Sequence, residues 1–384
     1  MLLRQFSRRI RQISGRDSLE RTLNKLRIAI VGAGHFARTC HIPGIRSHGG
    51  AEVVAICGRN KERTKLFAEQ EQIPQSFDDL STMLDEVECD AVTIASPDVL
   101  HFEHAMKVLE KGKHVFCEKP LAMNTEQART MADAAKKAGV VNMVAFTFRY
   151  LQSMQKMRQL IREGAIGRPF HLDMQLYWGD YLMPTALTWR DLSNQSAAGI
   201  WADAGAHLLD ASSYLFAPVN QVLARMQIVQ REPGFAQTET VDMFDCLAST
   251  EFFHKRESTP VSVSMKVTRL TRPRGPIFNL HVIGSKGSLA LPLEPRRIDS
   301  LSILPANAAD WQDVPLETAQ HPTLSRMLHS FVDAVSRGSV NKGQDAEFID
   351  GLNAQCALDA GLKSENSKKF EDVQYLAMAE MEAK

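Results

Sequence analysis

The sequence predicts an α/β protein built from two parts, a doubly wound parallel sheet followed by an α+β domain with a large open-faced, mostly antiparallel sheet. Three observations predict this fold class. Short β-branched runs alternate with helix-like segments between residues 26 and 146, the first run leads into a glycine-rich turn, and segments of period two follow residue 147. We expect a basic extension over 1–26, the parallel sheet over 27–146 and the second domain over 147–384.

The composition argues against several classes of partner. Lys plus Arg and Asp plus Glu number 45 each, so the balanced charge does not favour nucleic acid. No run reaches the roughly 18 apolar residues that a membrane-spanning helix needs. The cysteines at 40, 57, 89, 117, 246 and 356 show neither paired metal spacing nor a disulfide framework. We therefore expect buried free thiols in a reducing cytoplasm.

The first 26 residues carry seven basic side chains against only Asp17 and Glu20. Ser7-Arg8-Arg9 is similar to a twin-arginine export signal, but no continuous apolar run follows it. An organelle-targeting peptide is a second interpretation, which the two acidic residues weaken. We favour a basic arm that is flexible or lies on a neighbouring subunit.

The first strand, expected over Leu26–Val31, leads directly into Gly32-Ala33-Gly34-His35-Phe36-Ala37. In a G-x-G-x-x-A pattern the first glycine permits the tight turn and the second lets the backbone approach a pyrophosphate. The small third residue allows close packing, and the helix that follows offers free N–H groups to phosphates. Because a second strand follows at 53–57, we prefer a dinucleotide site over a purely structural glycine turn.

The end of the second strand indicates which dinucleotide is bound. An acidic residue at this point would hold the ribose 2′-hydroxyl of NAD. The chain instead continues with Gly58-Arg59-Asn60-Lys61-Glu62-Arg63, and Arg59 and Arg63 stand one helical turn apart. Guanidinium groups match phosphate geometry, so NADP is favoured over NAD. Alternatively, Arg59 stacks on the adenine or faces solvent.

The alternation of strands and helices continues to residue 146, for six strands in all. We expect a strand over 90–95 that ends at Ser96-Pro97, and then a helix over 98–111 that ends at Gly112. The next strand begins at His114. It is followed by a helix that runs to about 138, with Asn124 and Gln127 as its capping box, and by a strand over 140–146. The crevice at the carboxyl ends is then lined by residues 32–37, Arg59, Ser96-Pro97 and Glu118-Lys119.

Lys119 is the strongest candidate in this crevice for a residue that takes part in the reaction. Pro120 disfavours the α region for the residue before it, so Lys119 should be extended at the carboxyl end of its strand. A lysine there is either a solvated loop residue or an acid/base group.

The second half of the chain has a different pattern. A helix is expected over 154–163, and helices also over 324–335 and 345–362. Period-two segments suited to an open-faced sheet lie at 170–176, 222–228, 240–249, 261–268, 279–283 and 288–293.

One helix-like stretch in this half carries candidate reacting groups. Asp203, His207 and Asp210 are spaced to share one face of a helix. A histidine beside carboxylates can be held in one tautomer and accept a proton near neutral pH. There are two alternatives. His207 is a capped histidine of the core, or two of these residues are ligands of a metal site. No further Cys/His cluster of ligand spacing accompanies these residues, so we expect no metal.

Several motifs together resemble those of the glucose–fructose oxidoreductase/inositol dehydrogenase/rhizopine catabolism (Gfo/Idh/MocA) family. They are Gly32–Ala37, Cys117-Glu118-Lys119-Pro120, and the segment 199–207, which is similar to the family's G-x-x-x-D-x-G-x-H motif. Supporting matches are Ser96-Pro97, His101, Phe148-Arg149-Tyr150, Trp189-Arg190 and Gly284-Ser285-Lys286-Gly287. The chain departs from the family at Ala197-Ala198-Gly199, where three glycines are common, and this narrows the expected substrate pocket.

The resemblance implies a Rossmann NAD(P)-binding domain and a sheet domain for substrate binding that usually forms dimers or tetramers. It implies hydride transfer between nicotinamide C4 and a carbinol or keto carbon of a sugar or cyclitol. Lys119 and His207 are then the acid/base candidates, with Asp203 orienting His207 or binding a substrate hydroxyl. The cofactor-binding candidates are Gly32, Gly34, His35, Phe36, Ala37, Arg59, Arg63, Ser96, Pro97, His101, Glu118 and Lys119. The substrate-binding candidates are Arg149, Trp189, Arg190, Asp203 and His207, with Tyr177, Trp178 and Tyr181 as further pocket residues.

The sequence therefore predicts an NADP-preferring dehydrogenase or reductase that acts on a polyhydroxylated ring. A regulator of sugar metabolism that binds the dinucleotide without turnover is the first alternative. A glycosidase that uses tightly held NAD for transient oxidation is the second.

Overall fold

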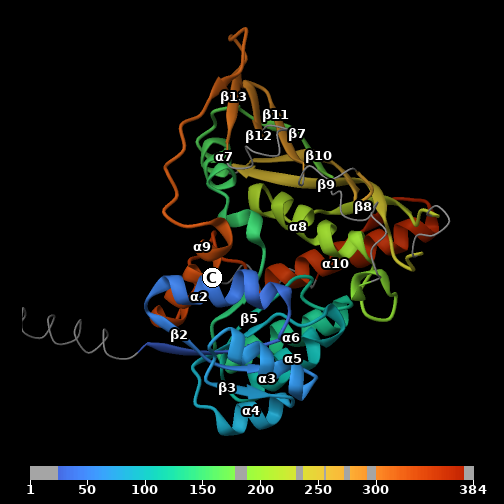
Figure 1. Cartoon of the computed structure of the whole chain (residues 1–384). Coiled ribbons are helices and arrows are strands. Elements are labelled where there is room, and N and C mark those ends of the chain that lie inside the picture. The colour runs from blue at the N-terminus through green and yellow to red at the C-terminus, as the bar shows by residue number, and fades with distance from the viewer. Residues whose placement is uncertain are drawn as a thin grey trace, which may run out of the picture.

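The computed structural model describes residues 25–177, 188–230, 237–254, 257–271, 277–291 and 300–375. Figure 1 shows the six-stranded sheet and its helices at one end of the molecule and the nine-stranded sheet at the other. Helices α8 (Ile200–Leu215) and α10 (Phe348–Ser367) lie between the two sheets. Among the described residues, no helix is both long and apolar enough to cross a membrane.

The six-stranded sheet is parallel throughout and runs in the order β3-β2-β1-β4-β5-β6. Its strands are β1 (Leu26–Val31), β2 (Ala51–Cys57), β3 (Gln75–Phe77), β4 (Ala91–Ile94), β5 (His114–Cys117) and β6 (Asn142–Val144). The sequence predicts six strands, with ranges for five of them. No range was predicted for β3, because it has three residues, begins Gln75-Ser76 and carries no apolar run. The order reverses between β1 and β4, which places a ligand crevice at their carboxyl ends.

Helices cover both faces of this sheet. They are η1 (Ala37–His41, a π-helix), α2 (Ile42–His48), α3 (Lys61–Gln70), α4 (Leu80–Glu86), η2 (Asp98–Leu100), α5 (His101–Glu110) and α6 (Thr125–Ala138). The expected cap of α6 is present, because Gln127 N donates to Asn124 Oδ1 at 3.0 Å. The Gln127 side chain accepts from the N–H of Met123 rather than from that of Asn124, so the predicted box is shifted by one residue.

The nine-stranded sheet runs in the order β14-β13-β12-β11-β7-β10-β9-β8-β15. Its strands are β7 (Pro169–Tyr177), β8 (Gln221–Gln227), β9 (Met243–His254), β10 (Glu257–Thr268), β11 (Ile277–Gly284), β12 (Gly287–Leu291), β13 (Ser302–Pro305), β14 (Gln312–Asp313) and β15 (Glu371–Asp372). Among the described strands of this sheet, only β7 and β10 pair in parallel. The mostly antiparallel sheet is therefore confirmed, although β13, β14 and β15 are too short to show a period.

This sheet buries one face against α8 and leaves the other open. Along β9, Phe244, Cys246 and Ala248 are buried, whereas Asp245 and Leu247 are exposed. The short elements η3 (Thr147–Tyr150), α7 (Gln152–Arg162) and η5 (Trp189–Asp191) complete the second domain. All six cysteines are buried and free, which confirms the prediction of free thiols.

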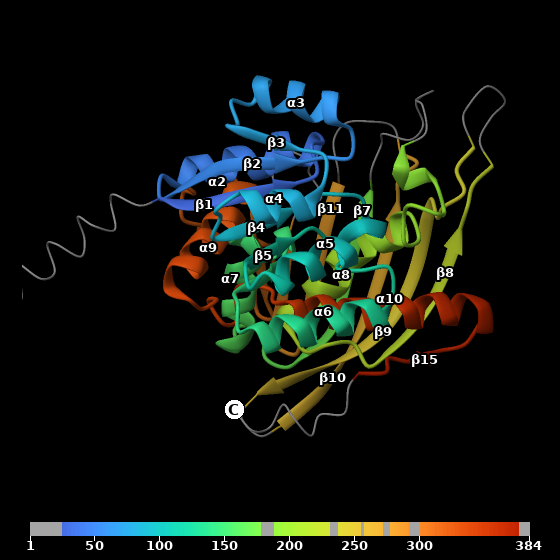
Figure 2. The ribbon, with the colours of Figure 1, turned by 90° about the horizontal axis from the view of Figure 1, so that it is seen from below.

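Helix α9 (Thr323–Arg337) packs against the first sheet and its helix α2, although in the chain it follows every strand of the second sheet except β15. Figure 2 shows α9 beside α2 and β1. A Cβ atom on Gly44 of α2 would lie 2.8 Å from Leu328 Cβ, so a glycine is needed for this close approach. The Phe331 ring centroid lies 5.4 Å from that of Phe116 on β5. The first sheet therefore shares its core with a helix from the end of the chain.

Candidate functional site

The glycine-rich turn after β1 has the geometry that a dinucleotide site requires. Gly32 has φ +107°, and a Cβ there would lie 2.5 Å from the carbonyl oxygen of Ala95. A Cβ on Gly34 would meet no atom within 4 Å, and Gly34 and His35 are exposed beside half-buried Phe36. Ala37 is fully buried. The turn is thus held tightly underneath and left open on its outer side, where a pyrophosphate would lie.

Two guanidinium groups lie at the carboxyl end of β2. Asn60 caps α3 by accepting from the N–H of Arg63, which places Arg63 in the first turn of the helix. Arg59 and Arg63 are both exposed. Within the described part of the chain neither side chain makes an ion pair, whereas Arg38 pairs with Glu71. Both groups are therefore available for an anion.

The loops after β4 and β5 hold Ser96, Pro97, Glu118 and Lys119, but two of the expected cofactor contacts lie beneath the crevice. His101 is fully buried, and its ring nitrogens lie 2.8 Å and 2.9 Å from the carbonyl oxygens of Pro120 and Ser96. Glu118 Oε1 lies 3.1 Å from Nε2 of fully buried His41. This corrects the expectation for these two side chains, because their polar atoms support the loops from inside.

Lys119 contacts the helix that carries the second group of candidate residues. Its ammonium donates to Asp203 Oδ1 and, at 3.1 Å, to the Asp203 carbonyl oxygen. Arg190 Nε lies 3.4 Å from the other carboxylate oxygen. Burial would raise the pKa of Asp203, but Lys119 and Arg190 outweigh it and hold that pKa well below its usual range. Asp203 therefore stays ionised and positions Lys119.

His207 lies one helical turn beyond Asp203 and is 7% exposed. Its ring stacks on Phe148 at 4.9 Å between centroids and 24° between planes. Nδ1 is buried and makes no hydrogen bond among the described residues, so a ligand would reach the ring through Nε2. Burial and, to a smaller extent, the charge of Lys119 lower the pKa of His207 to about 3, although Asp203 opposes this, so the imidazole is neutral near pH 7. Asp203 bonds to Lys119 rather than to this ring, which corrects the expectation that it orients His207.

Arg149 and Tyr177, which were expected to contact the substrate, use their polar groups away from the candidate site. Arg149 is 5% exposed, and its guanidinium donates to Asp210 from Nε and Nη2, with Asp350 3.0 Å from Nη2. Its position suits a buried support rather than a substrate contact. Tyr177 follows the alternation of β7 onto the open face, where its hydroxyl donates to Gln175 at 3.4 Å. Trp178 and Tyr181 lie outside the described residues, as does the side chain of Trp189.

A buried cluster that the sequence analysis missed anchors the segment with Arg190. Arg269 is 1% exposed and lies 3.2 Å from Asp191 Oδ1 and 2.7 Å from Asp242 Oδ1. Asp191 directly follows Trp189-Arg190, which was the available signal. Its partner Arg269 directly follows β10, and the second carboxylate on Arg269, that of Asp242, directly precedes β9. The cluster fixes η5 and thereby places Arg190 next to Asp203.

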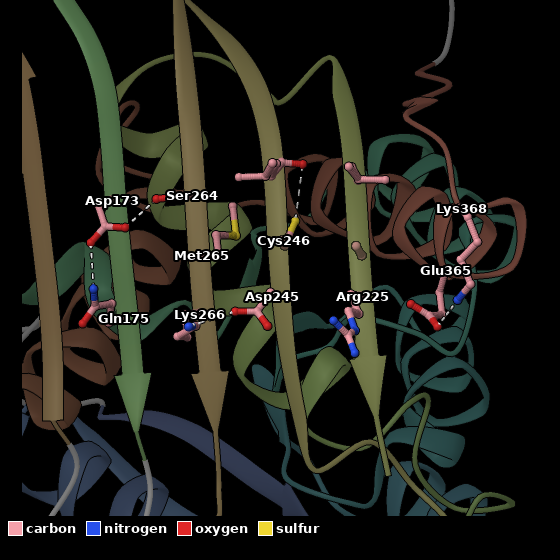
Figure 3. A pocket seen from close by; sticks show the side chains of 13 residues that line it. Asp173, Gln175, Arg225, Asp245, Cys246, Ser264, Met265, Lys266, Glu365 and Lys368 are labelled. Carbon is pink, nitrogen blue, oxygen red and sulfur yellow. Dashed lines mark hydrogen bonds and ion pairs between the residues drawn. The ribbon is translucent and has the colours of Figure 1, made fainter.

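A cavity of about 600 Å³ lies away from this site, on the open face of the nine-stranded sheet. Figure 3 shows its polar side chains paired with one another, with Asp173 between Ser264 and Gln175, Asp245 beside Lys266, and Glu365 beside Lys368. No candidate reacting group lines it. We therefore place the candidate active site at Lys119, Asp203 and His207, next to the glycine-rich turn.

A glycine-rich turn opening a parallel sheet, with candidate acid/base groups at the same edge of the sheet, is typical of nucleotide-dependent oxidoreductases. Two models of one family match the chain, the oxidoreductase family with an NAD-binding Rossmann fold over 26–146 and the GFO/IDH/MocA C-terminal domain over 154–290. The chain belongs to the Gfo/Idh/MocA family.

Several characterised proteins are similar to this chain. The D-glucoside 3-dehydrogenase of Escherichia coli is 33% identical over 50% of this chain and 55% of its own length. The 1,5-anhydro-D-fructose reductase of Ensifer adhaerens is 28% identical over 71% of this chain and 84% of its own length. A levoglucosan dehydrogenase in complex with NADH and levoglucosan has a TM-score of 0.80 at 23% identity, covering 92% of this chain and 100% of that chain. This structural likeness shows the shared fold.

Proposed function

We propose that this protein is an NADP-preferring dehydrogenase or reductase that transfers a hydride between the nicotinamide and a carbinol or keto carbon of a sugar or cyclitol. The observation that carries the proposal is the contact between Lys119 and Asp203. It joins the loop after β5 to α8 and so brings Lys119 close to His207, at the edge of the sheet where the glycine-rich turn also lies. The names of the similar proteins support a sugar or a related ring as substrate.

The residues around the glycine-rich turn fit a dinucleotide. The space beside Gly34 accommodates the pyrophosphate, and Ser96 and Pro97 line the crevice at the switch point of the sheet. When bound, the nicotinamide accepts or gives up the hydride. The chain's own groups then manage the proton and the substrate oxygen.

Lys119 and His207 divide this work in the mechanism that we propose. Asp203 holds the Lys119 ammonium as a hydrogen-bond donor at the crevice, where it stabilises negative charge on the reacting oxygen. His207 is neutral near pH 7, so its Nε2 has a free lone pair. During oxidation Nε2 accepts the hydroxyl proton as the hydride leaves, when that hydroxyl becomes strongly acidic, and during reduction it returns the proton. A regulator or an NAD-retaining glycosidase would be favoured instead by cofactor binding without oxidation of any polyol, or by a nicotinamide absorbance that survives purification.

Replacing Arg59 and Arg63 with alanine should weaken NADPH binding far more than NADH binding. Both groups are exposed and unpaired within the described residues, and a 2′-phosphate would give them a charged partner. A hydrogen bond to a charged group contributes roughly 1.5–3 kcal/mol, which is about 10- to 100-fold in affinity. Fluorescence titration of both nucleotides measures this. Arg38→Ala is the matched control, and equal losses for NADPH and NADH would contradict the NADP preference.

We also propose that the open sheet face forms a homodimer or a homotetramer. On β9, Leu247 is 50% and Phe253 is 65% exposed on this face. Sedimentation analysis should give a dimer or tetramer that Phe253→Asp dissociates, and a monomeric parent would overturn this part of the proposal.

A further inference from the structure

His101 is a fully buried histidine whose two ring nitrogens both face backbone carbonyl oxygens. Nδ1 lies 2.8 Å from the carbonyl oxygen of Pro120, and Nε2 lies 2.9 Å from that of Ser96. The residue is the first of α5, and its ring lies between the loops that follow β4 and β5.

These two contacts specify the protonation of the ring. A carbonyl oxygen only accepts, and a neutral imidazole has one N–H, so it can satisfy one of the two oxygens. Turning the ring over would place carbon atoms at these positions, closer than the roughly 3.3–3.6 Å of a C–H···O contact. Only an imidazolium donates to both carbonyl oxygens at the observed distances.

A carboxylate lies nearby to balance this charge. Asp98, in the turn before α5, is 4% exposed. Burial raises the pKa of Asp98 to about 6, while the charges of His101 and Lys119 oppose the rise. The other charged groups around Asp98 are Asp203 on α8 and Arg190 on η5.

His104 is the other ionisable group of α5 near this ring. Its Nδ1 lies 3.0 Å from the hydroxyl of Ser96. Burial lowers the pKa of His104 to about 4, so this second ring stays neutral. Glu118, across the loop, is directed to His41.

The two carbonyl groups belong to the loops that build the proposed active site. Ser96 lies against the glycine-rich turn, because a Cβ on Gly32 would come within 2.8 Å of Ser96 N. Pro120 follows Lys119 directly, and Lys119 reaches Asp203. One buried ring thus connects the turn that would hold the pyrophosphate to the lysine that would act on the substrate.

We propose that His101 is a positioning residue, a cationic clasp that holds the Ser96 and Pro120 loops together while both its ring nitrogens are protonated. A ring with a single proton would turn a lone pair towards one of the two carbonyl oxygens, so it would hold only one of the two loops. The effect of the clasp on turnover rests on the proposed function, whereas its protonation does not.

The test compares the parent protein with His101→Gln, with His104→Gln as the matched control. In spectra of protein with ¹⁵N-labelled histidine at pH 7, one histidine should show both ring nitrogens protonated. That signal should be absent from His101→Gln and present in His104→Gln. A His101 ring with a single proton at pH 7 would overturn the clasp.

A functional measurement uses the same variants. His101→Gln should bind NADPH roughly tenfold more weakly than the parent, because it loses one of two buried hydrogen bonds, whereas His104→Gln should bind it as the parent does. Parent-like NADPH affinity in His101→Gln would contradict the clasp. If no variant or parent binds a dinucleotide, the proposed function fails, and the ¹⁵N spectrum still decides the clasp.

If His101→Gln does not fold, the spectrum of the parent protein alone shows whether both ring nitrogens of His101 are protonated. Ring protons that are bonded to buried carbonyl oxygens exchange slowly with solvent. The other buried histidines of the described chain, His41 and His207, each leave Nδ1 without a hydrogen bond. A slowly exchanging pair of ring protons in the parent therefore identifies His101, and rapid exchange of one of them would overturn the proposal.

Discussion

Replacing Lys119 with alanine should lower kcat by roughly 10²- to 10³-fold, the usual contribution of one positioned donor to the negative charge that develops on the reacting oxygen. The variant loses the only side chain that reaches from the β5 loop to Asp203 among the described contacts. Asp203 keeps Arg190 as a charged neighbour, so the fold should survive. Steady-state kinetics on the preferred polyol, together with NADPH titration, separate lost chemistry from lost binding.

His207→Ala provides the companion measurement, with a loss of similar size. Lys113→Ala is the matched control, because Lys113 stands just before the opposite end of the same strand. Turnover within about threefold of the parent for both Lys119→Ala and His207→Ala would show that neither residue has the assigned role.

Replacing Arg149 with alanine should lower the free energy of unfolding by about 3–5 kcal/mol, the usual cost of removing one partner of a buried ion pair. The change leaves the Asp210 carboxylate, which is 2% exposed, without its bidentate partner. Burial raises the pKa of Asp210, and Arg149 opposes this rise in the parent. Urea unfolding followed by circular dichroism measures the loss.

The loss should depend on pH in a defined direction. A carboxyl whose folded pKa is raised stabilises the fold below its unfolded value, near 3.9, and this contribution is lost as pH rises through the folded value. The Arg149→Ala variant should therefore be less impaired in mildly acidic buffer than at pH 8. Exposed Arg162→Ala should stay within about 0.5 kcal/mol of the parent. A similarly small change for Arg149→Ala would show that the ion pair is not a buried support.

The sequence predicted the features that depend on neighbours along the chain. Gly32 and Gly34 stand where a strand meets a helix, and the structure places them in the tight turn with an open outer side. The cap at Asn124 and the stop at Gly112 also follow from local chemistry. Longer strands show their period, but β3 and β15 are too short for any pattern.

Features that depend on distant partners were not predictable in this way. Arg149 matched a family motif, and only its contact with Asp210, 61 positions away, shows that its donors are used inside the protein. His101 likewise matched a motif, and its role depends on the carbonyl oxygen of Pro120. Alternation placed Tyr177 on one face of β7, but the sequence could not say which face would be covered by α8.

The return of α9 to the first sheet has a consequence for protein engineering. Met327, Leu328 and Phe331 are fully buried in the core that this helix shares with β1 and α2. Burial of such side chains contributes about 1.5–3 kcal/mol each, against a net stability of about 5–15 kcal/mol for a typical protein. A fragment that ends at residue 146 would present this apolar surface to water and would aggregate. The nucleotide-binding half is therefore not a portable module, and a chimera that transplants it must carry α9 from the same parent.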